Sequence, residues 1–428
     1  MGHWSGGVFT HHGFRRLWLA NLTGGFGQQF ATLALGVTAV VVLHASTLQL
    51  GIIAALGTAA NLILGIPIGV WVDALPQKWV LVVAGVARAA AVVTIPLAFL
   101  AGILTIVQCM GVAAIVGTAT VFFDTAHTSI LPSLLSADRV SEANARLQTS
   151  DSTVRIVGPG LAGQLLRITG APILYFVTGA MEIISAILVS SMKIDLPETA
   201  RKQRQPFWAS LREGLAYVIR HPVLRVFNIT NAAINLGAGV VSAVFLFFAL
   251  NQLHIAPSVY GLILSVGAFG GILGSLIALP LARRYGDLRT RSATLYILPF
   301  TVALIPCAAI FPFSQIFTLG AAEFLISAVL VTTSIPAAGI RARVTPLALM
   351  GRVSAASRFV SLGVLPLGAL LGGLLGGVLG AGGALWIAVG LMLIGAAFML
   401  VSPLGRIRHL PAEYVLTEAD TVNHCDDH

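Results

Sequence analysis

The chain has 428 residues, of which 57% are hydrophobic and 10% are charged, and its mean hydropathy is +0.92. A soluble core cannot bury that much apolar surface, so these values exclude a soluble globular protein. The 25 lysine and arginine residues outnumber the 16 aspartate and glutamate residues, which gives a net charge of +9.

Apolar segments follow one another along the chain with short breaks between them. A helix needs about 20 mostly apolar residues to cross the hydrocarbon layer of a membrane. We therefore predict an all-α membrane protein of twelve transmembrane helices in two six-helix bundles. The first six helices are expected at 14–43, 47–72, 79–101, 103–123, 144–168 and 171–192, and the second six at 223–250, 258–282, 291–311, 313–339, 350–379 and 381–402.

One long polar stretch separates the two sets of helices and sets the predicted domains. In that stretch Phe207, Trp208 and Leu211 are interleaved with Arg212 and Glu213, which favours a helix on the membrane surface, although a flexible linker also fits. The prediction is an N-terminal bundle at 1–192, a cytoplasmic linker at 193–222, a C-terminal bundle at 223–402 and a disordered cytoplasmic tail at 403–428.

The positive charges predict the orientation, because lysine and arginine in short loops stay on the cytoplasmic side. With a cytoplasmic N-terminus, only Arg167 reaches the outer side. We expect a multi-pass protein of the plasma (inner) membrane with both termini in the cytoplasm. The asymmetry accounts for the net charge, so we expect no nucleic-acid partner. We also expect the protein to be a monomer in the lipid bilayer. The residues expected inside are Arg15, Arg16, Lys78, Arg139, the linker cluster, Arg283, Arg284, Arg289, Arg291, Arg341, Arg343, Arg406 and Arg408.

The two halves repeat each other. Polar and proline positions coincide at a shift of 207 residues in helices 1, 4 and 5 against 7, 10 and 11, whereas the loop after the second helix fits best at a shift of 210. Two related bundles are typical of secondary transporters, which bind substrate between the halves and alternate access to it. The coinciding pairs include Asn21 with Asn228, Gln28 with Asn235, Thr125 with Thr332, Ser150 with Ser357 and Pro159 with Pro366.

The segment GVWVDALPQK, from Gly69 to Lys78, closes the second predicted helix. Gly69 permits close helix contact, and Asp73 can pair with a cation or cap a neighbouring helix. The segment resembles the cytoplasmic loop signature of the major facilitator superfamily, from which Ala74 and Pro76 depart. This resemblance implies a gating role for Gly69, Asp73 and Lys78.

The segment GPGLAG lies in the fifth predicted helix and contains Gly158, Pro159 and Gly163. The proline bends the helix, and the small residues let another helix approach. The segment is similar to the antiporter signature of exporters in the same superfamily, with Ala162 in place of one glycine. We predict that these residues form a hinge or a sealed contact used in gating.

A longer resemblance covers nearly the whole membrane portion. FFDTAHTSILPSLLSADRVSEANARL at 122–147, LWLANLTGGFGQQF near the start, and Arg88 resemble the macrolide, multidrug and enterobactin-type exporters of the superfamily. This resemblance implies proton-driven export of amphipathic small molecules such as drugs, macrolides or siderophores. That branch often has an acidic residue where this chain has Gln28. Arg88 is predicted either to gate by pairing with an acid such as Asp124, or to extend to the inner surface.

Two acidic residues lie deep within predicted helices. Placing an ionisable group at bilayer depth costs about 2.5–3.5 kcal/mol on insertion scales, so each such residue is expected to have a structural or functional role. Glu182 in helix 6 and Glu323 in helix 10 are therefore predicted either to carry protons or to hold helices together.

Asp151 and Arg155 lie one turn apart in helix 5. They either exchange partners when a proton arrives or form a static ion pair.

Uncharged polar residues recur at helical spacing in helices 1 and 7. We predict that they line the substrate cavity, although such amides also hold membrane helices together. Amides within an apolar surface favour a mostly hydrophobic ligand with a few hydrogen-bonding groups. The predicted substrate-binding residues are Asn21, Gln28 and Thr32 in helix 1, and Asn228, Asn231 and Asn235 in helix 7.

Other classes of function lack the residues that they need. The sequence has no phosphate-binding loop and no catalytic Ser, His and Asp set at one depth, so we predict no enzyme activity. Cys109, Cys307 and Cys425 suggest neither a disulfide framework nor a metal site. We therefore expect no cofactor. The resemblance to the exporter branch implies the proton gradient as the energy source. An importer, a facilitator or a lipid flippase remains the alternative, and short loops disfavour a scaffold.

Overall fold

The computed structural model describes residues 8–63, 68, 71–72, 75–135, 137–192, 207–310, 314–346, 349–408, 410–411 and 414. Within these residues the chain is almost entirely helical and contains no strand. It forms two compact units. The first comprises Met1–Gln203 with His254–Ser265, and the second comprises Arg204–Leu253 with Val266–His428.

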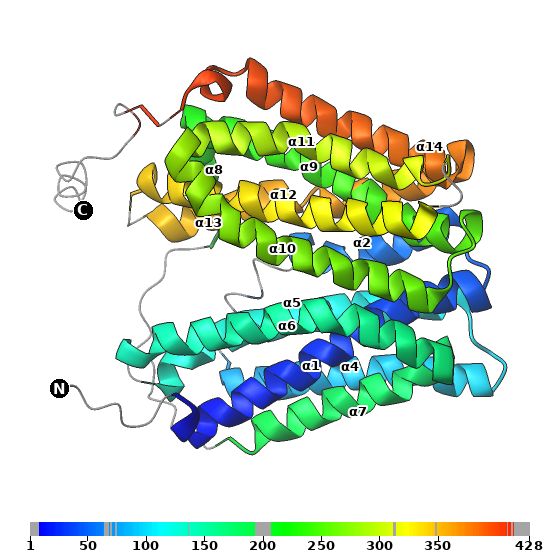
Figure 1. Ribbon diagram of the computed structural model, residues 1–428. Helices are drawn as coiled ribbons and strands as arrows, with labels where there is room; N and C mark the ends of the chain where they lie inside the picture. The colour runs from blue at the N-terminus through cyan, green and yellow to red at the C-terminus, as the bar shows by residue number, and fades with distance from the viewer. Residues whose placement is uncertain are drawn as a thin grey trace. The chain divides into compact units, whose positions relative to one another are not determined.

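The first unit is built from six long helices (Figure 1). Helix α1 packs against α6 and α7, α4 lies against both α5 and α7, and α2 packs on α5. Apolar side chains such as Leu17, Leu81 and Ile130 fill the interior. The helices are α1 (His12–Val37, continued by a π-helix at Thr38–Val42), α2 (Thr47–Ile63), α4 (Gln77–Leu100), α5 (Ile106–Leu134), α6 (Ala137–Thr169) and α7 (Ala171–Ser190).

The second unit repeats this plan and adds an amphipathic helix, α8 (Phe207–Arg220), that packs against α13. Helix α9 packs along α14, and α11 contacts both α12 and α14. The first turns of α10, as far as Ser265, belong to the first unit. The remaining helices are α9 (Pro222–Phe247, continued by a π-helix at Phe248–Gln252), α10 (Pro257–Tyr285), α11 (Asp287–Cys307), α12 (Gln315–Arg343), α13 (Met350–Leu362) and α14 (Leu365–Val401).

The described helices correspond to twelve membrane-spanning segments, which is the number that the sequence predicts. Among the described residues, nine segments are long and apolar enough to cross a membrane. One of them, Met350–Val401, has 52 residues and contains two spans. Gly380 separates the two, because its backbone has φ 75° and ψ 161°, a conformation that interrupts a helix and suits glycine. The shorter α2 and the more polar α6 complete the set.

The two units match each other at a shift of 210 residues. His44 and His254 both have positive φ, as do Gly170 and Gly380. Helices α1 and α9 also begin and end 210 residues apart, as do their π-helices. The shift of 207 expected for helix 1 is therefore corrected, and the counterpart of Asn21 is Asn231. Shifts that differ by three residues, close to one helical turn, bring the same faces together.

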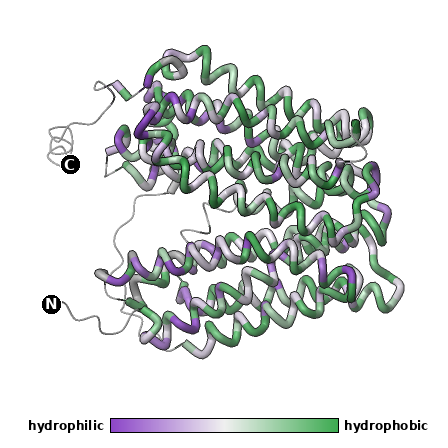
Figure 2. Tube along the Cα trace, viewed as in Figure 1, coloured by the Kyte–Doolittle hydropathy of each residue, from purple (hydrophilic) through white to green (hydrophobic). Residues whose placement is uncertain are grey.

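Most helix boundaries fall within a few residues of those expected, but two helices are longer. Helix α5 ends at Leu134 rather than at 123, and α6 begins at Ala137 rather than at 144. Hydropathy marks only the segment within the hydrocarbon layer, and a helix continues beyond it into polar turns. Figure 2 shows this pattern, with hydrophilic residues gathered toward helix ends and hydrophobic residues along the middle.

The GPGLAG segment of α6 packs against the start of α10 within the first unit. The backbone N–H of Gly160 donates to Ser265 Oγ at 2.8 Å. A Cβ atom at Gly261 would lie 2.4 Å from the carbonyl oxygen of Pro159, and one at Gly163 would lie 2.8 Å from that of Ser258. The two helices therefore approach so closely that only glycine fits at these positions.

We predict that Gly261→Ala lowers the free energy of unfolding by about 1–3 kcal/mol, because the added methyl group overpacks this contact. Thermal unfolding of the purified protein in detergent measures the change. The control is Gly111→Ala in α5, where an added Cβ meets nothing within 4 Å. Helix propensity favours alanine there, so the control should not be destabilised. Equal melting temperatures for Gly261→Ala and the wild type would contradict the tight contact.

Candidate functional site

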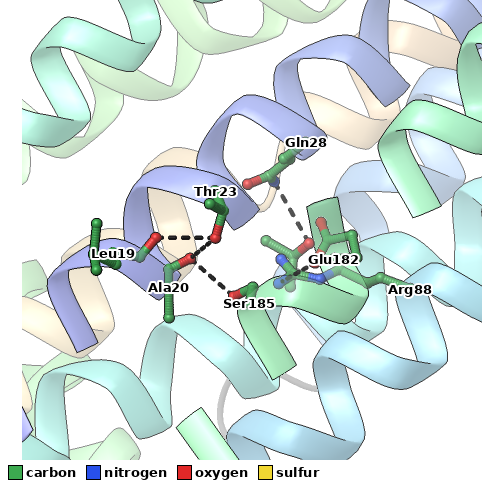
Figure 3. Close-up of polar contacts among 8 residues, drawn as sticks. Leu19, Ala20, Thr23, Gln28, Arg88, Glu182 and Ser185 are labelled. Carbon is green, nitrogen blue, oxygen red and sulfur yellow. Dashed lines mark hydrogen bonds and ion pairs between the residues drawn. The ribbon is translucent and has the colours of Figure 1, made fainter. Parts of the chain in front are cut away.

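An ion pair lies inside the first unit between α4 and α7. Arg88 Nη2 is 2.9 Å from Glu182 Oε2, and the two side chains are 3% and 2% exposed. Figure 3 shows Glu182 and Arg88 facing each other beside α1. Because two charges are removed from water together, each depends on the other for compensation.

Neighbouring helices enclose this pair. The Arg88 guanidinium lies 4.5 Å from the ring centroid of Phe123 in α5, within the range of a cation–π contact. On α1, a Cβ atom added at Gly27 would lie 3.5 Å from Glu182 Oε1, so this helix passes directly over the carboxylate. Ser185, one turn from Glu182, donates to the Ala20 carbonyl at 2.8 Å and joins α7 to α1 (Figure 3).

The predicted polar residues of α1 mostly contact other helices of the first unit. Asn21 Nδ2 donates to Asp151 Oδ1 at 2.7 Å, and Gln28 Nε2 donates to Thr120 Oγ1 at 3.5 Å. Thr32 is exposed and donates to the Gln28 carbonyl at 2.9 Å. Through these contacts, Asn21 joins α1 to α6 and Gln28 joins α1 to α5.

Asp151 takes a different partner from the one that its spacing favours. It accepts from Asn21, and among the described residues it forms no ion pair with Arg155, whose side chain is exposed. Asn144 and Gln148, on the same side of α6, are also exposed. The expected static ion pair is therefore corrected: on this face the rotation of α6 directs only Asp151 toward α1.

A polar cavity of about 200 Å³ lies inside the second unit. Three predicted residues of α9 line it, and α11, α12 and α13 supply the facing side chains. Asn228 also hydrogen-bonds Ser357 Oγ at 3.3 Å and so holds α13 against α9. The principal polar lining residues are Asn228, Asn231, Asn235, Arg291, Arg341 and Ser357.

Arg291 is the dominant charge of this cavity. Its side chain is 1% exposed, Nη2 donates to Asn231 Oδ1 at 2.8 Å, and the guanidinium lies 4.1 Å from the ring centroid of Phe227. The sequence predicts a helix that begins at Arg291, where the apolar run starts. The structure begins α11 earlier, at Asp287, so Arg291 lies one turn inside the helix and is buried. Hydropathy does not show this extension, and the burial of Arg291 is therefore not predicted. Arg291, Leu295 and Leu298 recur at helical spacing and so share one helix face, which could have indicated that Arg291 is buried with the two leucines.

A larger cavity of about 600 Å³ lies between α4 and α5 and is lined almost wholly by apolar side chains. Two of its lining residues, Val83 and Ile115, are 64% and 49% exposed. In a membrane protein, apolar side chains on an outer surface face lipid. We therefore regard this cavity as a lipid-facing groove of the first unit.

The other predicted coupling and gating residues are spread over both units. Glu323 packs beside Gly267 of α10 and forms no ion pair among the described residues. Lys78 Nζ donates to the Met192 carbonyl at 2.7 Å, joining the ends of α4 and α7. Asp124 is exposed on α5. Gly69 and Asp73 lie outside the described residues.

The comparisons with known proteins identify the class. The sequence matches the family described as "Transmembrane secretion effector" over residues 4–417, so the chain belongs to this family of the major facilitator superfamily. It is a multi-pass membrane protein of transporter type in contact with the lipid bilayer, and proteins of this family and fold are not enzymes.

Individual relatives agree with this assignment. The "uncharacterized MFS-type transporter YvqJ" of Bacillus subtilis (strain 168) is 25% identical over 241 residues, which cover 55% of this chain and 57% of the relative. The "multidrug efflux pump Tap" of Mycolicibacterium fortuitum is 26% identical over 278 residues, covering 61% and 66%. The matched region therefore spans less than two thirds of either relative.

Solved structures of transporters share the fold. An inward-facing, unoccupied bacterial homologue of the human lysosomal transporter Spinster has a TM-score of 0.73 and 14% identity over 97% of this chain and 100% of its own. An inward-facing bacterial homologue of the iron transporter ferroportin has a TM-score of 0.73 and 16% identity over 94% and 100%. The fold class predicted from the sequence is thereby confirmed.

We predict that the Arg88–Glu182 pair is strongly coupled in stability. Glu182→Gln and Arg88→Gln each leave one buried charge uncompensated and should destabilise the protein by about 3–5 kcal/mol. The double variant leaves two amides that can bond to each other and should recover most of this loss. Thermal unfolding of the four proteins in detergent gives the interaction energy. Additive losses in the double variant would mean that the two residues act independently.

Proposed function

We propose that the protein is a secondary active transporter that exports amphipathic small molecules from the cytoplasm in exchange for protons. Its place is the plasma membrane with both termini in the cytoplasm, and it uses no cofactor. The buried Arg88–Glu182 pair carries the proposal, since it is a carboxylate inside the membrane region whose charge has a single close counter-ion.

Protonation of Glu182 provides the coupling step. The carboxylate attracts the Arg88 guanidinium only while it is ionised, and this attraction is strong where water is excluded. A proton arriving at Glu182 cancels the attraction and leaves Arg88 without its partner. The packing of α4, α7 and α1 around the pair then favours a different arrangement, so the position of these helices follows the protonation state.

The direction and substrate class rest on the family and on chemistry. The family description refers to secretion, and Tap is named as a multidrug efflux pump. The amides of α9 face a cavity that also has apolar walls, which suits a mainly hydrophobic molecule with a few polar groups. Asn228, Asn231 and Asn235 are therefore assigned to substrate binding.

Substrate-induced proton movement in sealed vesicles tests this proposal. Purified protein is reconstituted with a pH-sensitive dye inside, and erythromycin, ethidium and norfloxacin, which has a carboxylate, are added as amphipathic probes. We expect at least one probe to induce proton flux through the wild type. Glu182→Gln, and the double variant with Arg88→Gln, should reduce that flux at least tenfold, because neither contains a carboxylate that can carry the proton.

The matched control is Glu142→Gln, which removes an exposed glutamate at the start of α6. It should transport like the wild type. Probe movement without proton flux in the wild type would favour a facilitator or a lipid flippase on the same fold. Probe uptake that runs with the proton gradient rather than against it would favour an importer. Undiminished proton flux in the double variant would remove Glu182 from the mechanism.

A further inference from the structure

The cavity of the second unit contains a buried cation, and none of its described lining residues is a carboxylate that could balance it. Among the described residues, Arg291 forms no ion pair, and its Nε has no hydrogen-bond partner. The neutral amide of Asn231 and the ring of Phe227 stabilise the guanidinium but leave its charge uncompensated. An unbalanced charge removed from water costs several kcal/mol, so this arrangement calls for an anion.

A second cation lines the same cavity. Arg341 of α12 is half-buried there, and no aspartate or glutamate contributes to the described lining. Asp287, the acidic residue at the start of α11, is engaged by Arg343. Arg291 also lies one turn from the N-terminus of α11, where the helix dipole favours negative rather than positive charge. Two arginine side chains and the positive end of the α11 dipole thus lie at this cavity.

The repeat shows that the fold itself does not require these cations. At the shift of 210 residues, Arg291 corresponds to Leu81 and Arg341 to Leu131, and both leucines lie in the apolar core of the first unit. In that unit the buried cation Arg88 is neutralised by Glu182. The second unit therefore has two basic residues where the same scaffold is stable with leucine, and its described residues provide no counter-ion for the buried one.

We propose that this cavity binds an acidic group, such as a carboxylate, of the transported molecule. This inference rests on the proposed export function and specifies its substrate class as amphipathic acids. Arg291 and Arg341 supply the positive charge, and Asn235 and Ser357 offer hydrogen bonds. At about 200 Å³ the cavity has room for an acidic group and a short apolar segment, but it is smaller than the usual site for a whole drug-sized ligand.

Equilibrium binding to the full-length protein tests the inference. The protein is placed in phosphatidylcholine nanodiscs, and calorimetry compares 3-phenylpropionate with its neutral amide, 3-phenylpropionamide. The wild type should bind the acid at least tenfold more tightly than the amide, a difference of about 1.4 kcal/mol. Arg291→Gln and Arg341→Gln should each lower that preference at least tenfold. Arg289→Gln is the matched control, because Arg289 is exposed on the same helix.

Each outcome decides the proposal. Equal binding of acid and amide by the wild type overturns it, as does an undiminished preference in Arg341→Gln. The half-buried Arg341 keeps the test valid if Arg291→Gln fails to fold. Nanodiscs that contain phosphatidylglycerol distinguish the source of the acid: if this lipid displaces 3-phenylpropionate from the wild type but not from Arg341→Gln, the cavity binds lipid headgroups, and the substrate assignment is overturned.

The test is independent of proton coupling, because it uses no gradient and no transport. Absence of an acid preference in the wild type, alongside intact proton-coupled movement of erythromycin or ethidium, which have no acidic group, would overturn this inference alone. Failure of Glu182→Gln to change proton flux would overturn the coupling step alone, with the acid preference unaffected. The two proposals can therefore fail separately.

Discussion

Charge inside the membrane region has to be balanced where it lies, and the ion pair between Arg88 and Glu182 meets this constraint in the first unit. The pair joins α4 to α7, and α1 passes over it with glycine at the point of contact. Removing either charge leaves the other without compensation, so the packing of three helices depends on one electrostatic contact. We propose that this dependence lets a protonation event at Glu182 move helices, since the proton changes the interaction that holds them.

The second unit has the same arrangement of helices as the first but a different distribution of buried charge. Its helices follow those of the first unit at a shift of 210 residues, including the π-helices and the positive-φ histidines His44 and His254. The positions of Arg88 and Glu182 are occupied there by Leu298 and Met392, both buried and apolar. Arg291 instead lies in a cavity whose described lining contains no carboxylate. One unit thus contains a neutral pair suited to coupling, and the other contains positive charge suited to an acidic ligand.

The sequence predicts the membrane class, the helices and the repeat because each rests on local hydropathy and spacing. It also singles out Glu182 and Arg88, since charges at bilayer depth are rare and costly. It does not establish that these two meet, because partners on different helices depend on how each helix is rotated. It places Arg291 at the very start of a helix, because apolarity begins just after it, and so does not show that this side chain is buried one turn inside α11. The shift of 207 instead of 210 arose because residues three apart share a helical face.

Infrared difference spectroscopy on the protein in lipid tests the central claim most directly, because a protonated carboxyl group has a carbonyl stretching band that a carboxylate lacks. On acidification, the wild type should gain such a band that Glu142→Gln keeps and the double variant of Arg88→Gln with Glu182→Gln lacks. Addition of a transported probe should change the band in the wild type. An identical band in the wild type and the double variant would contradict the account, because Glu182 would then not exchange the proton.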